Sequence, residues 1–216
     1  MKKTLQVSLA LAVLSVAGIN AALAQDKAPT EAKIAMCIGC HGIPGYQATF
    51  PEVHKVPMIA GQGAKYISAA LTAYAKGERK HPTMRGIALS LSDADIAEIS
   101  AYYEAQAKVA AVAEAPPPAS PEVSKLLEKG ACASCHGANF SKPIDGSYPK
   151  IAGQHADYLY VALKAYKTEG KPYVGRGNAI MAGQVKQFSQ AELKTLAKYL
   201  ASLPGELRTV PQSKLR

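Results

Sequence analysis

The residues best suited to chemistry form a five-residue string that occurs twice. Its copies span residues 37–41 (CIGCH) and 132–136 (CASCH), and both read C-x-x-C-H. Two thiols at this spacing can add to the two vinyl groups on one edge of a porphyrin, and the histidine that follows can present an imidazole nitrogen to the iron. C-x-x-C-H is therefore the attachment signature of a c-type haem. The sequence predicts two covalently bound haem c groups, attached at Cys37, Cys40, Cys132 and Cys135.

A C-x-x-C pair also occurs in redox dithiols, and two pairs can form a four-cysteine zinc site. A thioredoxin-like dithiol belongs near a βαβ pattern, and no strand-rich segment lies near either copy. A zinc site needs no histidine directly after each second cysteine. The two motifs hold all four cysteines of the chain, so none is left over for a disulfide. Haem attachment is the favoured interpretation.

The first two dozen residues have the pattern of an export signal. Lys2 and Lys3 form a short positive region, residues 5–18 are mostly apolar, and residues 22–24 read Ala-Leu-Ala, a small-residue cleavage site. We expect residues 1–24 to be a signal peptide; a retained membrane anchor is the alternative. Export to a bacterial periplasm fits the cysteine usage, because thiols without a covalent partner are oxidised there.

The full chain has a formal charge of +9, and the positive charge is concentrated in its second half. Residues 26–115 carry nine basic and nine acidic side chains, whereas residues 116–216 carry fourteen and seven. A basic domain can bind nucleic acid, but export argues against that partner. An acidic patch on a redox protein and peripheral association with an anionic membrane surface fit better, and a merely solvated face is the remaining alternative.

An Ala/Pro-rich stretch divides the chain into two halves that repeat. Residues 108–121 (KVAAVAEAPPPASP) include three consecutive prolines and predict a semi-rigid linker. On either side of it, Pro-x-Ile-Ala-Gly-Gln occurs at residues 57–62 and at 149–154. We therefore predict two tandem domains, residues 25–107 and 122–216, related by duplication with changes in loop length.

The pattern within each half is helical. Apolar and aromatic residues recur at helical spacing over residues 62–76 and 154–168, and a helix over residues 30–36 is expected to run into the first motif. Ser92 and Ser189 each precede an acid by three residues and predict capped C-terminal helices; only the second, with glutamate, is a proper capping box. Domains this small have a thin core, to which a buried haem would add apolar surface.

A six-coordinate haem iron needs a ligand opposite the histidine, and methionine is one that raises the reduction potential. Met84 and Met181 each lie eight residues before the serine that caps the last helix, in polar, Gly/Pro-bearing sequence that predicts loops. Met36 abuts the first motif and Met58 has no methionine counterpart in the second half. The predicted axial iron ligands are His41, Met84, His136 and Met181.

Three histidines outside the motifs compete as ligands. His54 lies in a loop without a counterpart, His155 aligns with Gly63, and His81 lies three residues from Met84 with no matching histidine. A ligand role should recur in both halves, so each is expected to be a surface side chain. His81 is the one placed to replace Met84 on the iron at high pH or on oxidation.

These features together resemble the class I c-type cytochromes, and their tandem arrangement resembles the dihaem cytochrome c4 family over essentially the whole mature chain. The resemblance implies an all-α fold of two class I cytochrome c domains. Each is a small helical bundle around one covalently bound His/Met haem, and the two haems face each other across a pseudo-twofold interface. It also implies that Pro57 and Pro149 orient the axial histidines through their carbonyls, and that Gln62 and Gln154 contact the haem surroundings. The longer loop of residues 41–56 departs from the pattern and is expected to alter haem exposure or to contact a partner.

Two six-coordinate irons leave no open position for a substrate, so the resemblance implies an electron-transfer protein rather than an enzyme. We expect a periplasmic dihaem cytochrome that carries electrons from a quinol-oxidising complex or a dehydrogenase to a terminal oxidase. The alternative is the cytochrome c subunit of a periplasmic flavoprotein dehydrogenase, such as a sulfide dehydrogenase. A dihaem peroxidase would need one open iron, against which the paired methionines argue.

Overall fold

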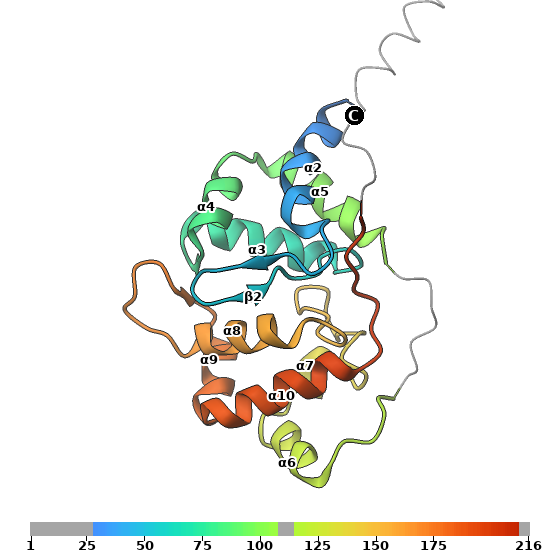
Figure 1. Cartoon of the computed structure of the whole chain (residues 1–216), viewed down its shortest axis with the longest axis vertical. Coiled ribbons are helices and arrows are strands. Elements are labelled where there is room, and N and C mark those ends of the chain that lie inside the picture. The colour runs from blue at the N-terminus through green and yellow to red at the C-terminus, as the bar shows by residue number, and fades with distance from the viewer. Residues whose placement is uncertain (1–27, 108–114, 212–216) are drawn as a thin grey trace, which may run out of the picture.

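The computed structural model describes residues 28–107 and 115–211 of the 216-residue chain. The predicted signal peptide and the first half of the predicted linker lie outside these residues. The two halves of the chain stack along the long axis of the molecule, with the first half above the second in Figure 1. In the part that the structure describes, no helix combines the length and the apolar character that a membrane span requires.

The first half is a group of helices with one short hairpin and a further strand that pairs with the second half. Its helix α2, which was expected to run into the first motif, passes through it to His41. The elements in chain order are α2 (Ala28–His41), β1 (Gln47–Ala48), β2 (His54–Lys55), α3 (Ala64–Lys76), β3 (Arg79–Lys80), α4 (Pro82–Leu89) and α5 (Asp93–Glu104).

The second half repeats this order without the β1–β2 hairpin. Its helix before the motif begins with Pro121 after the N-cap Ser120, and a separate short helix carries the motif. The elements are α6 (Pro121–Lys129), α7 (Ala133–His136), α8 (Ala156–Tyr166), β4 (Gly175–Arg176), α9 (Ala179–Lys186) and α10 (Gln190–Ser202).

Each half has its own apolar core, formed where the C-terminal helix packs on the helix that follows the repeated Pro-x-Ile-Ala-Gly-Gln. In the first half, Leu71 of α3 packs with Ile99 of α5. In the second half, Leu159 of α8 packs with Leu200 of α10. Both C-terminal helices begin with a complete capping box; contrary to expectation this includes the first, because the Asp95 carboxylate accepts from the Ser92 N–H at 2.9 Å.

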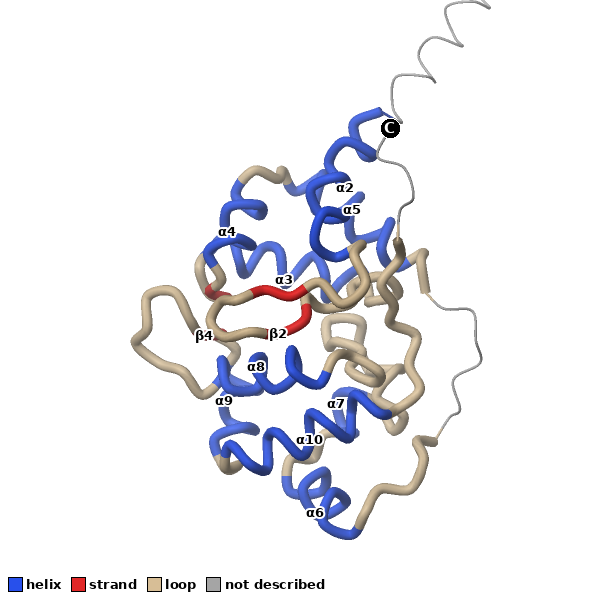
Figure 2. The backbone as a smooth tube through the Cα atoms, in the orientation of Figure 1, coloured by secondary structure: helices blue, strands red, loops and turns tan. Residues whose placement is uncertain are grey.

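A strand pair, the returning C-terminal segment and a hairpin are among the contacts that join the halves. The antiparallel pair β3–β4 contains one strand from each half, with Arg79 opposite Arg176. The chain after α10 returns to the first half, where the Arg208 N–H donates to the Ala60 carbonyl at 3.1 Å. Figure 2 shows this return as a loop that runs alongside both halves. The third connection is the hairpin β1–β2, whose strand β2 packs against α8 of the second half.

Candidate haem-binding sites

The two cysteine pairs lie in separate halves, each beside its motif histidine. Cys37 and Cys40 lie on the last turns of α2. Cys132 is the N-cap residue of α7, and Cys135 lies within that helix. All four thiols are free of disulfides. Among the described residues, no three Cys, His, Asp or Glu side chains are grouped to hold a metal, so the pairs do not combine into the alternative zinc site.

The thiols differ from those of a reactive dithiol. Burial raises the pKa of both Cys37 and Cys132, whereas the nucleophilic cysteine of a redox C-x-x-C has a lowered pKa. A raised pKa keeps these cysteines as neutral thiols in the protein without haem. The local environment therefore does not support the redox-dithiol alternative.

Both motif histidines have the same hydrogen-bond geometry. The Nδ1 of His41 lies 2.8 Å from the Pro57 carbonyl oxygen, and the Nδ1 of His136 lies 2.9 Å from that of Pro149. When Nδ1–H donates to the carbonyl, the neutral ring keeps a lone pair on Nε2, the form that binds iron. Burial lowers the pKa of both rings by more than the carbonyls raise it, which favours this neutral form.

The predicted ligand methionines occupy equivalent places, but on helices rather than in loops. Met84 is the third residue of α4, whose N-cap His81 accepts from the Met84 N–H at 3.4 Å. Met181 is the third residue of α9, whose N-cap Asn178 accepts from the Met181 N–H at 2.9 Å. The loop prediction was wrong because it relied on polar composition, while a capping side chain was enough to start each short helix.

The side chains of Gln62 and Gln154 are buried in the junction between the halves. The Gln62 amide donates to the Lys150 carbonyl and accepts from the Lys150 N–H, both at 2.9 Å. The Gln154 amide makes the same pair of bonds with Met58, at 2.9 and 3.0 Å. Each glutamine thus binds the backbone of the other half, at the residue that directly follows the proline contacting that half's motif histidine. Their predicted contact with a haem edge stays a prediction.

The three histidines that competed as iron ligands lie in three different environments. His81 caps α4, and His155 is half-buried at the start of α8. His54 is only 5% exposed, so the prediction of a surface side chain was wrong for it. Its ring stacks on Tyr158 of the second half, with centroids 6.2 Å apart. The contact joins residues about a hundred positions apart, which a local pattern does not reveal.

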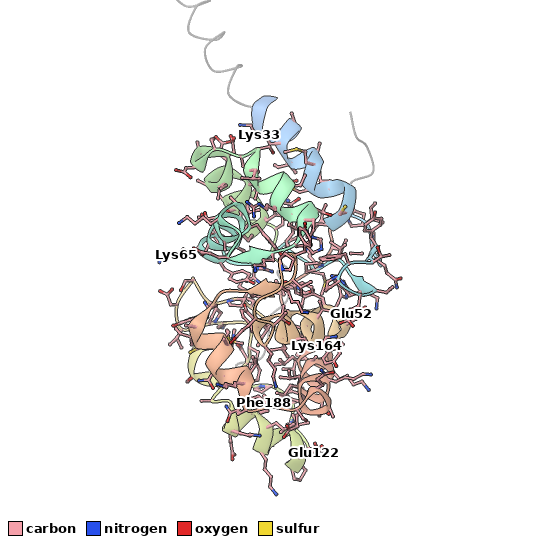
Figure 3. The ribbon with its side chains drawn as sticks, turned by 90° about the vertical axis from the view of Figure 1, so that its left-hand side faces the viewer. Lys33, Glu52, Lys65, Glu122, Lys164 and Phe188 are labelled. Atoms are coloured by element: carbon pink, nitrogen blue, oxygen red, sulfur yellow. The ribbon has the colours of Figure 1, made fainter. Side chains whose placement is uncertain are left out.

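The longer loop of the first half therefore contacts this chain itself. Besides the His54 stacking, the Lys55 N–H donates to the Asp157 carboxylate at 3.1 Å. Glu52 forms an ion pair with Lys164 of α8, and both are labelled at the boundary between the halves in Figure 3. The loop therefore packs against α8 of the same chain. The expected effects on haem exposure and on a partner contact stay predictions.

Two arginines and four tyrosines that the motif search did not select meet at the same junction. Arg79 donates to the hydroxyls of Tyr66 and Tyr158, at 3.1 and 2.8 Å, and Arg176 donates to Tyr158 at 3.1 Å. The signal that could have found them is the repeat, because both halves place two tyrosines eight residues apart on one helix and an arginine after that helix. Those residues are Tyr66, Tyr74 and Arg79, and Tyr158, Tyr166 and Arg176.

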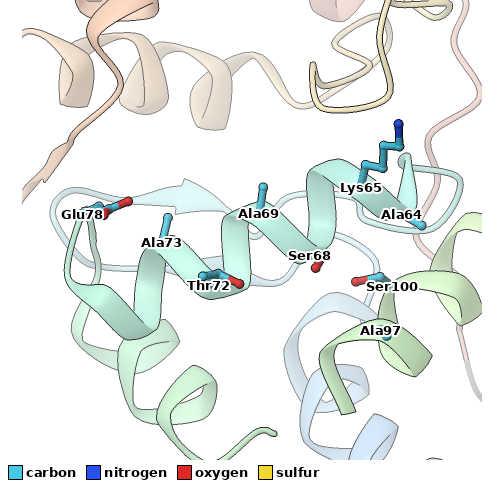
Figure 4. A pocket seen from close by; sticks show the side chains of 9 residues that line it. All are labelled: Ala64, Lys65, Ser68, Ala69, Thr72, Ala73, Glu78, Ala97 and Ser100. Atoms are coloured by element: carbon cyan, nitrogen blue, oxygen red, sulfur yellow. The ribbon is translucent and has the colours of Figure 1, made fainter. Parts of the chain in front are cut away.

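A shallow hollow of about 580 Å³ lies along α3 and is lined mainly by small side chains, as Figure 4 shows. Ala97 and Ser100 of α5 complete its wall. It contains none of the cysteines, histidines or methionines predicted to bind haem. The donor sets described above fit the haem groups, and this hollow takes no part in them.

Comparison with known proteins identifies the fold. A family model described as Cytochrome c matches residues 121–204. Cytochrome c4 of Stutzerimonas stutzeri is 31% identical over 89% of this chain and 96% of its own length. The thiosulfate dehydrogenase electron acceptor of Stutzerimonas stutzeri strain A1501 is 29% identical over 77% and 78% of the two chains. The structure of Acidithiobacillus ferrooxidans cytochrome c4 matches with a TM-score of 0.60 and 27% identity, over 79% of this chain and 99% of that one. The mainly helical, two-part fold matches as a whole, and this protein belongs to the cytochrome c4 family.

Proposed function

We propose that this protein is a periplasmic electron carrier in which His41 and Met84 bind one haem iron and His136 and Met181 bind the other. Its family consists of electron-transfer proteins, and the family together with the two cysteine pairs implies two covalently attached haem c groups. The observation that carries the ligand assignment is the duplicated geometry. In each half the Nδ1 of the motif histidine lies within hydrogen-bonding distance of a proline carbonyl oxygen. In each half the methionine is the third residue of a helix with a side-chain N-cap.

Each haem supplies a one-electron couple, and the chain determines how that couple is used. The cysteines fix the macrocycle, and the prolines hold the imidazoles in one orientation. With haem bound, Met84 and Met181 would close the irons to substrates and raise their reduction potentials. The arrangement supports electron transfer rather than catalysis at the iron.

The proposed route leads from a quinol-oxidising complex or a dehydrogenase to a terminal oxidase. The basic second half supports docking to an acidic patch on one of these proteins. The export-signal pattern of residues 1–24 supports a periplasmic location.

An optical spectrum of the purified mature protein, with haem quantified per chain, tests this proposal. We expect two haems per chain and a far-red methionine–ferric band at full strength for both. Met84→Ala and Met181→Ala should each remove half of that band. The control is Met58→Lys, which introduces the residue found at the equivalent position of the second half and should leave the band unchanged. A wild-type band at half strength would contradict the paired assignment.

A second candidate function is the cytochrome partner of one particular dehydrogenase, such as a flavoprotein that oxidises sulfide. The relative named as a thiosulfate dehydrogenase electron acceptor favours a role of this kind. Stable co-purification of this chain with a larger catalytic subunit would support it. Recovery of the chain alone, with equal reactivity toward several donors, would favour the general carrier.

A further inference from the structure

We propose that the hydroxyl of Tyr103 donates a hydrogen bond to the sulfur of Cys37 once that cysteine carries its haem, and that this bond raises the reduction potential of the first haem alone. The inference rests on the proposed function, because that function supplies the haem and its redox couple. It gives the two haems, whose proposed iron ligands are of the same kind, different surroundings at one cysteine sulfur.

The fold places Tyr103 against the segment that attaches the first haem. Helix α5 packs against α2, as Figure 1 shows, and Cys37 of α2 packs against the apolar core cluster that includes Tyr103 of α5. The Tyr103 carbonyl accepts from the Gly61 N–H at 2.7 Å. Its ring packs edge-on against that of Tyr102, with centroids 5.2 Å apart. Backbone and ring contacts therefore hold this tyrosine in place.

The Tyr103 hydroxyl is buried and unused. The residue is only 5% exposed, and its hydroxyl has no hydrogen-bond partner among the described residues. A buried hydroxyl without a partner is costly. The Cys37 sulfur lies beside it: burial raises the pKa of the Cys37 thiol, and the Tyr103 hydroxyl partly opposes that rise. Burial also raises the pKa of Tyr103, so the phenol keeps its proton and remains a donor at neutral pH.

Haem attachment changes the hydrogen bonds that the sulfur can form. As a thiol, Cys37 donates toward the Lys33 carbonyl, 3.9 Å away. When the thiol adds to a vinyl group, a carbon–sulfur bond forms and the hydrogen of the thiol moves to the other vinyl carbon. The sulfur is then a thioether, which has lone pairs but no hydrogen, so it can only accept. A thioether is a weak acceptor, but a hydrogen bond to it is stronger in a buried, low-dielectric environment than in water.

The second half lacks this donor. Leu200 of α10 is the structural counterpart of Tyr103, because its carbonyl accepts from the Gly153 N–H at 2.9 Å as that of Tyr103 does from Gly61. Cys132 packs against the core cluster that includes Leu200. Burial raises the pKa of Cys132, and no hydroxyl of a described residue opposes that rise. The leucine fills the same place without offering a hydrogen bond, so the two cysteine sulfurs differ in this respect.

Replacement of Tyr103 by phenylalanine isolates the effect of the hydroxyl. A donor at the sulfur withdraws electron density from the edge of the haem and disfavours the extra positive charge of ferric iron. Hydrogen bonds around a haem are one of the means by which a protein sets its potential. Tyr103→Phe keeps the ring and should lower the midpoint potential of the first haem. We expect a change of about threefold in the oxidation equilibrium, which is about 28 mV at 59 mV per tenfold for one electron.

The test is a redox titration of the dihaem protein followed by NMR. The ligand-methionine resonance that is lost in Met84→Ala assigns the first haem. The matched control is Tyr199→Phe, which removes a hydroxyl from α10 that donates to the Pro117 carbonyl at the surface, at 3.3 Å; it should leave both potentials unchanged. A second measurement is resonance Raman spectroscopy of the carbon–sulfur stretching bands. One of these bands should shift in D₂O in wild type and should not shift in Tyr103→Phe.

The outcomes separate this inference from the proposed function. Two haems with full methionine bands, but a first-haem potential that moves no more in Tyr103→Phe than in Tyr199→Phe, would overturn the inference and leave the proposed function intact. A lower potential in Tyr103→Leu without a change in Tyr103→Phe would also overturn it, because the packing of the ring rather than its hydroxyl would then set the potential. A wild-type methionine band at half strength would instead contradict the proposed function.

Discussion

Single residues decide how firmly each ligand methionine is held, and the two halves use different residues for this. His81 and Asn178 occupy the same N-cap position, three residues before Met84 and Met181. Asparagine is among the best N-cap residues, whereas histidine is not in that group. The longer bond at His81, 3.4 Å against 2.9 Å, agrees with this ranking. The proposed iron–methionine bond of the first half should therefore be the easier one to displace.

We predict that His81→Ala destabilises the first methionine site by less than the value of about 1 kcal/mol that is usual for an asparagine or serine N-cap, and that His81→Asn stabilises it. The measurement is denaturant unfolding of the ferric protein, followed by the far-red methionine band. Asn178→Ala is the matched control and should lower the stability of the second site. If His81→Ala and His81→Asn behave alike, the cap does not position Met84. An imidazole–methionine exchange at high pH in wild type, absent from both variants, would support the predicted replacement of Met84 by His81.

A second prediction concerns acid stability. Asp95 pairs with Lys33 and completes the capping box of α5. The hydrogen bond from Lys33, followed by those from Ser92, lowers the pKa of Asp95 from 3.8 to about 2. Because the folded protein has the lower pKa, this contribution to stability is present above about pH 4 and is lost as the pH falls toward 2. The pH dependence of the unfolding free energy over this window should be flatter in Asp95→Asn than in wild type. The control is Asp93→Asn, whose carboxylate is exposed; an equal effect there would contradict the prediction.

At the scale of elements, the repeated Pro-x-Ile-Ala-Gly-Gln segments carry both the histidine contacts and the junction between the halves. The carbonyl of the proline accepts from the histidine of its own half, and the glutamine five residues later reaches the opposite segment. The glycine between them has a positive φ, +85° at Gly61 and +73° at Gly153. A Cβ at Gly61 would lie 2.6 Å from the Glu206 carbonyl oxygen, so both the conformation and the close approach require glycine.

We predict that Gln62→Ala or Gln154→Ala loosens the junction without removing haem. Each change leaves a backbone N–H and a carbonyl of the other half without partners, at a cost of about 1–3 kcal/mol when these stay buried. Wild type should unfold in one transition by both haem signals, and the variants should separate the signals of the two halves. Gln47→Ala is the control, since that side chain is exposed on β1. Coincident transitions in both junction variants would show that other contacts hold the halves together.

The sequence predicted the elements better than the contacts between them. The repeat located two helical halves, and the capping serines located the last helix of each, because these signals are local. Hydrogen bonds such as Gln62 to Lys150 join residues 88 positions apart and leave no periodic trace. His54 shows the same limit: the absence of a counterpart indicated a surface residue, whereas its ring is buried against Tyr158. The paired arginines were detectable in principle, since both halves contain one, but nothing local indicates that they meet.

At the scale of the whole molecule, charge differs between the two ends. Residues 116–216 include twice as many basic as acidic side chains, whereas residues 26–115 include equal numbers. Exposed lysines of the second half include Lys125 on α6 and Lys194 and Lys198 on α10. Because these helices lie at the end of the molecule far from the first half (Figure 1), an acidic partner attracted to them would approach the second haem site. Electrons would then enter or leave the protein at the second haem site. The junction would connect this site to the first haem site.

We predict that the triple change Lys125→Glu, Lys194→Glu and Lys198→Glu slows electron transfer with an acidic redox partner and weakens its dependence on ionic strength. Long-range attraction raises association rates by about tenfold or more and is screened by salt, so the loss should be largest at low ionic strength. The measurement is the rate at which oxidase-containing membranes oxidise the reduced protein, together with the rate of its reduction by a donor. Lys65→Glu with Lys76→Glu, both exposed on α3 of the first half, is the matched control.

If the two halves dock different partners, the triple variant should slow one reaction and spare the other. Equal slowing of both reactions, or an equal effect of the α3 variant, would mean that the charge acts through the net field of the molecule rather than through a docking face.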